Sequence, residues 1–145
     1  MAKINPYLNF RGEAEEAFNF YKEAFGGEFA NVMRYGEMPD CEEMKLAEED
    51  KNKIVHIALP FGEGQVLMGN DVIGQHLDEK VDGINVSISV SPDSKEETDD
   101  FFKNLSAGGD VEMPLGDTFW GAYFGMLTDK FGVRWLLNYD YQQEN

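Results

Sequence analysis

His56 is the residue whose type and position point most directly to chemistry. It lies in the run KIVHIALPFG, where it alternates with Val55, Ile57 and Leu59. In a strand this alternation places His56 on the face opposite the more apolar side. An imidazole on such a face could act as a general base or a hydrogen-bond donor near neutral pH. The alternative is a histidine that only packs against the wall of a cavity.

A second group of side chains could bind a ligand without reacting with it. Arg134, on the same predicted strand face as Leu136, could clamp a carboxylate or phosphate, or pair with one of the many acids. Phe119 and Trp120, beside Tyr123, could form an aromatic wall, or could pack in a core or dimer seam. Polar side chains on the first predicted strand of each half should line a wet cavity or an interface, because a closed core would leave them unpaired. These are Tyr7, Asn9, Asn85, Ser87 and Ser89.

The remaining reactive residue types are weaker candidates. Cys41 lies in the acidic segment EMPDCEEMKLAEEDK, whose carboxylates disfavour a thiolate, so a surface loop or lid is the preferred interpretation. His76 lies in a polar connector and is expected to be solvated. Neither GxGxxG nor GxxxxGK[ST] occurs, which argues against a dinucleotide or methyl-donor site.

Two copies of one pattern are expected to position these residues. The first copy reads as a strand in INPYLNF, a helix in GEAEEAFNFYKEAFGG, and strands in EFANVMRYG, KIVHIALPFG and QVLMGND. The second reads as INVSISVS, the helix SKEETDDFFKNLSAGG, then VEMPLGD, AYFGMLTDKFG and VRWLLNYD. We therefore predict an α+β fold in which two tandem βαβββ modules form a curved mixed sheet. Module one spans residues 1–74, the connector 75–83 and module two 84–141, within a single domain, 1–145.

Composition sets the class of protein and its partners. With 145 residues, 42% hydrophobic and 13% aromatic, the chain is typical of a folded globular domain. Twelve basic and 28 acidic residues give a formal net charge of −16, which disfavours nucleic acid and anionic membranes as partners. The charge would attract a cationic ligand, although solubility alone also explains it. The sequence has no secretory signal or membrane-length apolar run, and we expect a cytoplasmic protein.

Several motifs spread along the chain indicate a family. NPYLNF, EAFNFYKEAFGGE, RYGEMPD, VHIALPFG with VLMGND, and DTFWGAYFGMLTDKFGVRWLLN together resemble the PhnB-like branch of the vicinal oxygen chelate superfamily. That superfamily includes glyoxalase I, extradiol dioxygenases and bleomycin-resistance proteins. The resemblance implies a cup enclosed by two modules, often completed across a dimer. We therefore expect a homodimer with a small-molecule ligand.

The resemblance also implies where a metal would bind. Superfamily enzymes hold a divalent metal with one ligand from the first strand and one from the last strand of each module. The internal repeat and the resemblance to glyoxalase I place these positions at Asn5, Met68, Asn85 and Leu136. None is a carboxylate or an imidazole, the usual ligands of such ions. We therefore predict a cup without a metal or other cofactor.

Function is predicted less sharply than fold. The preferred hypothesis is a metal-free small-molecule binding protein. One alternative is sequestration of a cationic drug, as in bleomycin-resistance proteins. Another is an isomerase or lyase with His56 as acid or base, Tyr7 or Tyr123 in proton transfer and Arg134 as anion anchor. A third is a protein that works only through its dimer surface. Some PhnB-like proteins are called demethylubiquinone methyltransferases, but the missing methyl-donor site argues against that activity.

Overall fold

The chain folds as two compact units. The computed structural model describes residues 5–38, 45–73 and 86–141, and divides at Lys80 into unit 1 (Met1–Lys80) and unit 2 (Val81–Asn145). Unit 1 contains β1 (Tyr7–Phe10), α1 (Ala14–Phe25), β2 (Asn31–Arg34), β3 (Ile54–Phe61) and β4 (Gln65–Asp71). Unit 2 contains β5 (Ile88–Val90), α2 (Lys95–Ser106), β6 (Asp110–Asp117), β7 (Ala122–Thr128) and β8 (Arg134–Asp140). Cys41, His76 and the predicted connector 75–83 lie outside the described residues.

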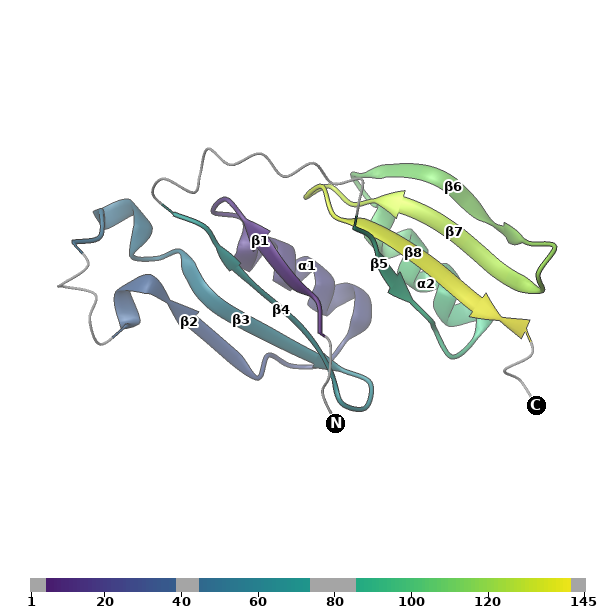
Figure 1. Cartoon of the computed structure of the whole chain (residues 1–145), viewed down its shortest axis with the longest axis horizontal. Helices are drawn as coiled ribbons and strands as arrows, with labels where there is room; N and C mark the ends of the chain where they lie inside the picture. The colour runs from purple at the N-terminus through teal and green to yellow at the C-terminus, as the bar shows by residue number, and fades with distance from the viewer. Residues whose placement is uncertain (1–4, 39–44, 74–85, 142–145) are drawn as a thin grey trace. The chain divides into compact units, whose positions relative to one another are not determined.

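Both units have the same sheet topology. The strand order is β1-β4-β3-β2 in unit 1 and β5-β8-β7-β6 in unit 2, so each first strand pairs in parallel with the last strand of its own unit (Figure 1). The other pairings are antiparallel. The predicted α+β class and the repeated βαβββ order are confirmed. In unit 1, two short 3-10 helices, Tyr35–Glu37 and Glu48–Asp50, lie between β2 and β3.

Each helix begins and ends through identifiable contacts. In α1, Gly26 adopts a φ of 81° after the last turn, and its N–H donates to Lys22 O at 2.7 Å. In α2, the Ser94 hydroxyl accepts from Glu97 N at 3.0 Å, which is the first contact of a capping box. The Glu97 carboxylate accepts from Asp93 N at 3.0 Å, so the returning contact reaches the residue before the cap.

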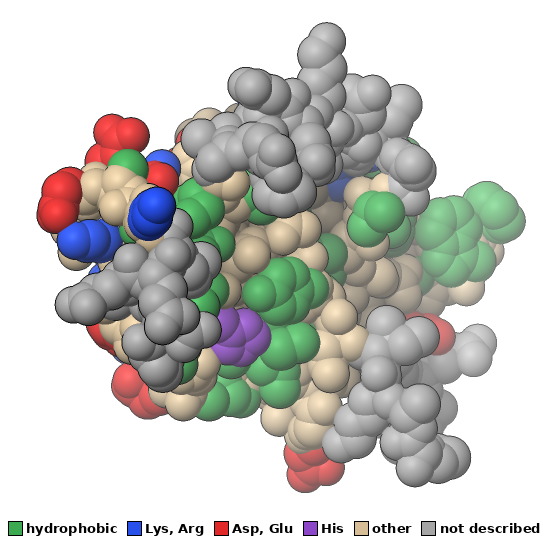
Figure 2. Space-filling model, turned by 60° about the vertical axis from the view of Figure 1, so that its left-hand side comes forward, with side chains coloured by type: hydrophobic (Ala, Val, Ile, Leu, Met, Phe, Trp, Pro, Cys, Tyr) green, Lys and Arg blue, Asp and Glu red, His purple; other side chains and the backbone are tan. Residues whose placement is uncertain are grey.

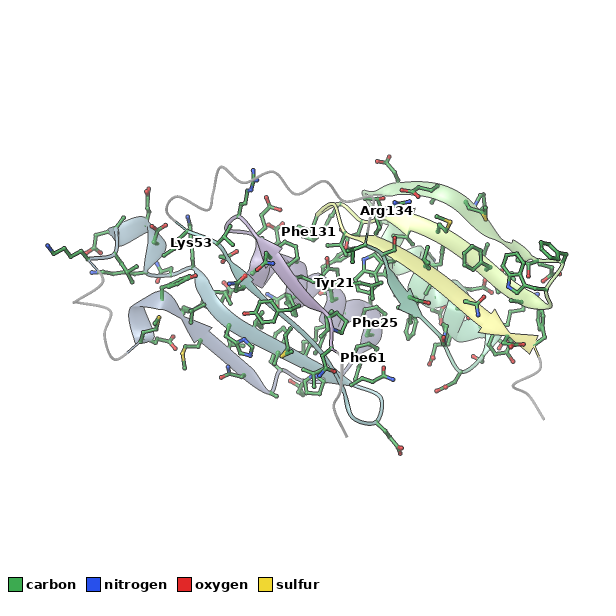
Figure 3. The ribbon with its side chains drawn as sticks, viewed as in Figure 1. Tyr21, Phe25, Lys53, Phe61, Phe131 and Arg134 are labelled. Atoms are coloured by element: carbon green, nitrogen blue, oxygen red, sulfur yellow. The ribbon has the colours of Figure 1, made fainter. Side chains whose placement is uncertain are left out.

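Glycines allow the helices to pack closely on the sheets. A methyl group on Gly69 of β4 would lie 2.7 Å from Phe18 Cε1 and 2.7 Å from Leu8 O. One on Gly125 of β7 would lie 2.8 Å from Phe102 Cε2. A helix phenyl ring thus occupies the space that a side chain on the sheet would fill. Phe25 of α1 and Phe61 of β3, both labelled in Figure 3, stack with ring centroids 5.3 Å apart.

Two buried aspartates fix the ends of strands. Asp71 Oδ1 accepts from Gly12 N and Ala14 N, and Oδ2 accepts from Ile54 N, each at 2.9 Å. Since Glu13 gives α1 no side-chain cap, Asp71 supplies one from β4 and also holds the start of β3. In unit 2, Asp129 has a similar role within the turn before β8. Its carboxylate accepts from Phe131 N, Val133 N and Trp135 Nε1, at 2.9, 3.0 and 2.9 Å.

Candidate functional site

The candidate site lies on the face of the unit 1 sheet opposite α1, called here the open face of unit 1. Alternation along the strands places the following side chains on it: Tyr7, Asn9, Asn31, Met33, His56, Ala58, Pro60, Val66, Met68 and Asn70. None of these strand positions holds Lys, Arg, Asp or Glu. The face therefore combines apolar side chains with uncharged hydrogen-bonding groups and one histidine.

His56 and Tyr7 form a ring pair on this face. Their ring centroids are 5.9 Å apart with an interplanar angle of 29°, and Tyr7 Oη lies 3.5 Å from His56 Nδ1. Tyr7 is 44% exposed and His56 is partly exposed. Figure 2 shows the only histidine of the described residues at the surface, in purple, with hydrophobic side chains beside it. The predicted orientation of His56, away from Ile57 and Leu59, agrees with this placement.

Strand register positions the neighbours of this pair. Met33 of β2 pairs with His56, and Tyr7 of β1 pairs with Met68. One step beyond the paired Ile57 and Gly69, His56 lies across from Asn70. Asn70 in turn pairs with Asn9. A row of polar side chains thus crosses the open face from β3 to β1, with Met33 continuing it onto β2 and Met68 in the neighbouring row.

Asn70 has an unusual environment. Its Oδ1 atom is buried and has no hydrogen-bond partner among the described residues. An unsatisfied buried acceptor costs about 1–3 kcal/mol, so each such atom in a folded protein calls for an explanation, of which a functional role is one. Asn70 was absent from the sequence predictions, although the alternation in QVLMGND already places it on the same face as Met68.

Burial influences the protonation of Tyr7. Desolvation raises the pKa of the Tyr7 hydroxyl above its ordinary value. The phenol therefore remains neutral at physiological pH and can donate a hydrogen bond. In this pair the phenol is therefore the candidate acid and the imidazole the candidate base.

Arg134 of unit 2 is already paired with a carboxylate. Its Nη2 donates to Glu112 Oε2 at 2.7 Å, and Thr128 Oγ1 donates to Glu112 Oε1 at 2.8 Å (Arg134 is labelled in Figure 3). The hydrogen bond from Arg134, then that from Thr128, lowers the pKa of Glu112. An anionic ligand would have to compete with Glu112 for the guanidinium, so the structure gives no support to a free anion clamp.

The predicted aromatic wall divides into two parts. Phe119 is 97% exposed and Trp120 54% exposed in the β6–β7 turn, where their rings meet edge to face at 5.1 Å. Trp120 also contacts the ring of Phe124 at 5.6 Å. Tyr123 instead faces α2, where its hydroxyl donates to Asp99 Oδ1 at 2.6 Å and Lys95 Nζ lies 4.8 Å from its ring centroid. Tyr123 therefore does not join Trp120.

Because of its contact with Asp99, Tyr123 should lose its proton at a higher pH than an ordinary tyrosine. The Asp99 hydrogen bond, assisted by burial, raises the pKa of Tyr123 to about 12. Because the folded pKa exceeds the unfolded one, the stability from this contact is complete below about pH 10 and is lost as pH rises towards 12. Asp99→Asn should bring the midpoint back towards 10. Carbon-13 NMR of the tyrosine rings would measure both midpoints, and an unchanged midpoint in the variant would contradict the assignment.

The remaining predicted positions are spread over both units. Asn5 Oδ1 accepts from Val66 N at 3.4 Å, and Ser89 pairs with Leu136 on β8. Ser87 precedes β5 and is partly exposed, and Asn85 lies outside the described residues.

The strand register differs from the predicted repeat by two residues. Leu8 and Ile88 occupy equivalent positions in the first strands of the two units. Leu8 pairs with Gly69, and Ile88 pairs with Trp135. The residue of unit 2 that is equivalent to Met68 is therefore Arg134 and not Leu136. Amides, a thioether and a hydrocarbon or guanidinium at these positions supply no carboxylate or imidazole, so together they would not neutralise a divalent cation. Among residues 5–38, 45–73 and 86–141, no three His, Cys, Asp or Glu side chains are grouped to hold a metal ion.

Comparison with known proteins identifies the family. The model of the Glyoxalase/Bleomycin resistance protein/Dioxygenase superfamily matches residues 3–137, and the chain belongs to this superfamily. A crystal structure of protein PA1353 from Pseudomonas aeruginosa is similar, with 40% identity, a TM-score of 0.82, and coverage of 97% of this chain and 98% of that one.

Two further relatives confirm the PhnB-like resemblance. A Bacillus cereus structure described as a putative 3-demethylubiquinone-9 3-methyltransferase, PhnB protein, is 31% identical with a TM-score of 0.76, covering 95% of this chain and 99% of that one. Protein YjdN of Escherichia coli K12 is 28% identical over 151 residues, covering 97% of each chain. Within the described residues, neither helix has the length and apolar character needed to cross a membrane.

Proposed function

We propose that this protein binds a small organic molecule without a metal, and that the ligand contacts the open face of unit 1 around His56. The observation that carries the proposal is the combination, on one sheet face, of the His56–Tyr7 ring pair with the buried Asn70 Oδ1, which has no partner within residues 5–38, 45–73 and 86–141. Ligand sites typically combine apolar and aromatic walls with a few convergent polar groups. Family membership supports this class of function, since the superfamily's name joins two enzyme classes with a drug-resistance protein.

Methionine methyl groups offer a direct test of where a ligand binds. Met33 and Met68 belong to the open face of unit 1, whereas Met113 and Met126 pair with each other on the sheet of unit 2. A thermal-shift screen of small aldehydes, quinones, amines and carboxylates would supply hits, because a ligand stabilises the folded state it binds. Methyl NMR should then show shifts at Met33 and Met68, with Met113 and Met126 unchanged. Shifts only in unit 2, or no hit at all, would refute the proposed site.

Variants of the site sharpen this test. His56→Ala should weaken the best hit roughly tenfold, about the effect of losing one ring contact and one hydrogen bond, and leave the melting temperature nearly unchanged. Phe119→Ser serves as the matched control because Phe119 is an exposed aromatic residue of unit 2. Equal losses in both variants would argue against a site centred on His56.

The absence of a metal is tested separately. Protein purified without a chelator should contain no stoichiometric Ni, Zn, Mn or Fe by elemental analysis. Addition of EDTA should leave both the melting temperature and ligand affinity unchanged. One tightly bound transition metal per chain would refute this part of the proposal, while the methyl shifts could still support the binding face.

Proton transfer is a second candidate function. The 3.5 Å separation of Tyr7 Oη and His56 Nδ1 favours it, since a neutral phenol beside an imidazole provides an acid and a base. Small ketones and aldehydes incubated with the protein in D₂O should then lose their α-proton NMR signals. His56→Ala would abolish this exchange, and Tyr7→Phe would slow it. Binding without exchange would instead favour sequestration.

A further inference from the structure

The open face of unit 1 also indicates the chemical class of its ligand. Resting on the function proposed above, we infer that the ligand is a planar organic molecule, neutral or cationic, that donates a hydrogen bond to Asn70. An anion is disfavoured. Three independent features of the face lead to this inference: its rings, its unpartnered acceptor and its charge.

The rings and thioethers favour a flat ligand. Tyr7 and His56 lie within 29° of parallel, so the pair presents aromatic surface with a common orientation. Met33 pairs with His56 in the register, and Met68 pairs with Tyr7, so a thioether adjoins each ring. Aromatic and sulfur groups both contact π-systems favourably.

The polar row requires a donor from the ligand. Asn70 Oδ1 is buried and has no hydrogen-bond partner in the part of the chain that the structure describes, while Asn9, its pair on β1, is exposed. A ligand N–H or O–H that reaches Oδ1 would relieve an unsatisfied acceptor, and a ligand that only accepts would not. Hydrogen-bond discrimination of this kind is stronger than discrimination by shape, because the wrong ligand leaves the protein group unpaired.

Charge on and around the face disfavours anions. The strand positions of the open face hold no Lys or Arg. Elsewhere in unit 1, Arg34 is paired with Glu15 and Lys53 with Asp50. The formal charge of the chain is −16, so its field repels anions and attracts cations. A carboxylate or phosphate would lose hydration here without gaining a cationic partner.

Four probes on a single ring system separate these features. Indole is planar, neutral and a donor, 1-methylindole lacks the donor, tryptamine adds a positive charge, and indole-3-carboxylate adds a negative one. Affinities of the EDTA-treated protein would be measured by methyl NMR at Met33 and Met68. We expect indole to bind about three- to tenfold more tightly than 1-methylindole, the value of one neutral hydrogen bond. Tryptamine should bind at least as tightly as indole, with affinity falling as salt rises, and the carboxylate most weakly.

Asn70→Leu identifies the group responsible. It keeps an approximately similar side-chain size and removes the acceptor, so indole and 1-methylindole should then bind equally while the fold stays intact. The inference is overturned if wild-type protein binds both equally, if the carboxylate binds best, or if Asn70→Leu preserves the preference. Should none of the four probes bind while other screened molecules shift Met33 and Met68, the ligand class is wrong and the binding site stands. If no molecule shifts these methyls, the proposed function itself fails.

Discussion

Asp71→Ala should destabilise unit 1 by about 3 kcal/mol or more. Three backbone N–H groups, those of Gly12, Ala14 and Ile54, donate to this carboxylate, and the residue is only 1% exposed. Each buried donor left without a partner costs roughly 1–3 kcal/mol, and alanine offers no acceptor. Urea denaturation would measure the change in free energy of unfolding. Hydrogen exchange should also show loss of protection at the amides of Ala14 and Ile54.

Controls distinguish hydrogen bonding from other effects at this position. Asp71→Asn retains one acceptor oxygen but directs an amide NH₂ towards backbone donors. It should therefore lower the free energy of unfolding by a measurable amount, but by less than Asp71→Ala does. Asp100→Ala, on the exposed surface of α2, should change the free energy of unfolding by less than about 0.5 kcal/mol. Equal stability of Asp71→Ala and Asp100→Ala would show that Asp71 does not hold α1 and β3 together.

Periodicity was sufficient to predict the elements and their faces. Alternation along KIVHIALPFG put His56 opposite Ile57 and Leu59, and the structure has Ile57 and Leu59 buried with His56 partly exposed. Side chains alternate strictly along a strand, so a single correct face assignment extends to the whole strand. The same rule assigned Phe10 inward and Asn9 outward on β1.

Chain adjacency was a poorer guide than alternation at Tyr123. Its position beside Trp120 suggested a shared aromatic wall. Tyr123 pairs with Tyr139, which is fully buried, and its hydroxyl reaches Asp99 of α2. Phe124, one residue later, contacts Trp120 instead. Strict use of alternation from the buried Leu127 would have placed Tyr123 on the helix side.

Contacts between distant segments could not be predicted from one sequence. The role of Asp71 depends on β4 ending beside the loop before α1, a distance of 57 residues along the chain from Ala14. The pairing of Arg134 with Glu112 spans 22 residues and depends on the irregular register between β6 and β7. Their residue types gave no signal, because Asp and Arg are as typical of solvated surfaces as of such contacts.

Gly69→Ala should lower the free energy of unfolding by about 1–3 kcal/mol, an effect second only to that of Asp71→Ala among the proposed substitutions. The added methyl group would lie 2.7 Å from both Phe18 Cε1 and Leu8 O. Phe18 is fully buried and Leu8 O is backbone on the paired strand β1, so neither can move without disturbing the contact between α1 and the sheet. Denaturant unfolding would measure the loss.

Gly116→Ala is the matched control for this substitution. Gly116 also lies in a strand, β6, and a methyl group added there would have no atom within 4 Å. Stability should be unchanged or raised by up to about 1 kcal/mol, because alanine restricts the unfolded chain. Gly125→Ala, whose methyl group would meet Phe102 at 2.8 Å, should resemble Gly69→Ala. Equal stability of all three variants would show that the close packing of a helix phenyl ring on Gly69 and Gly125 does not stabilise the fold.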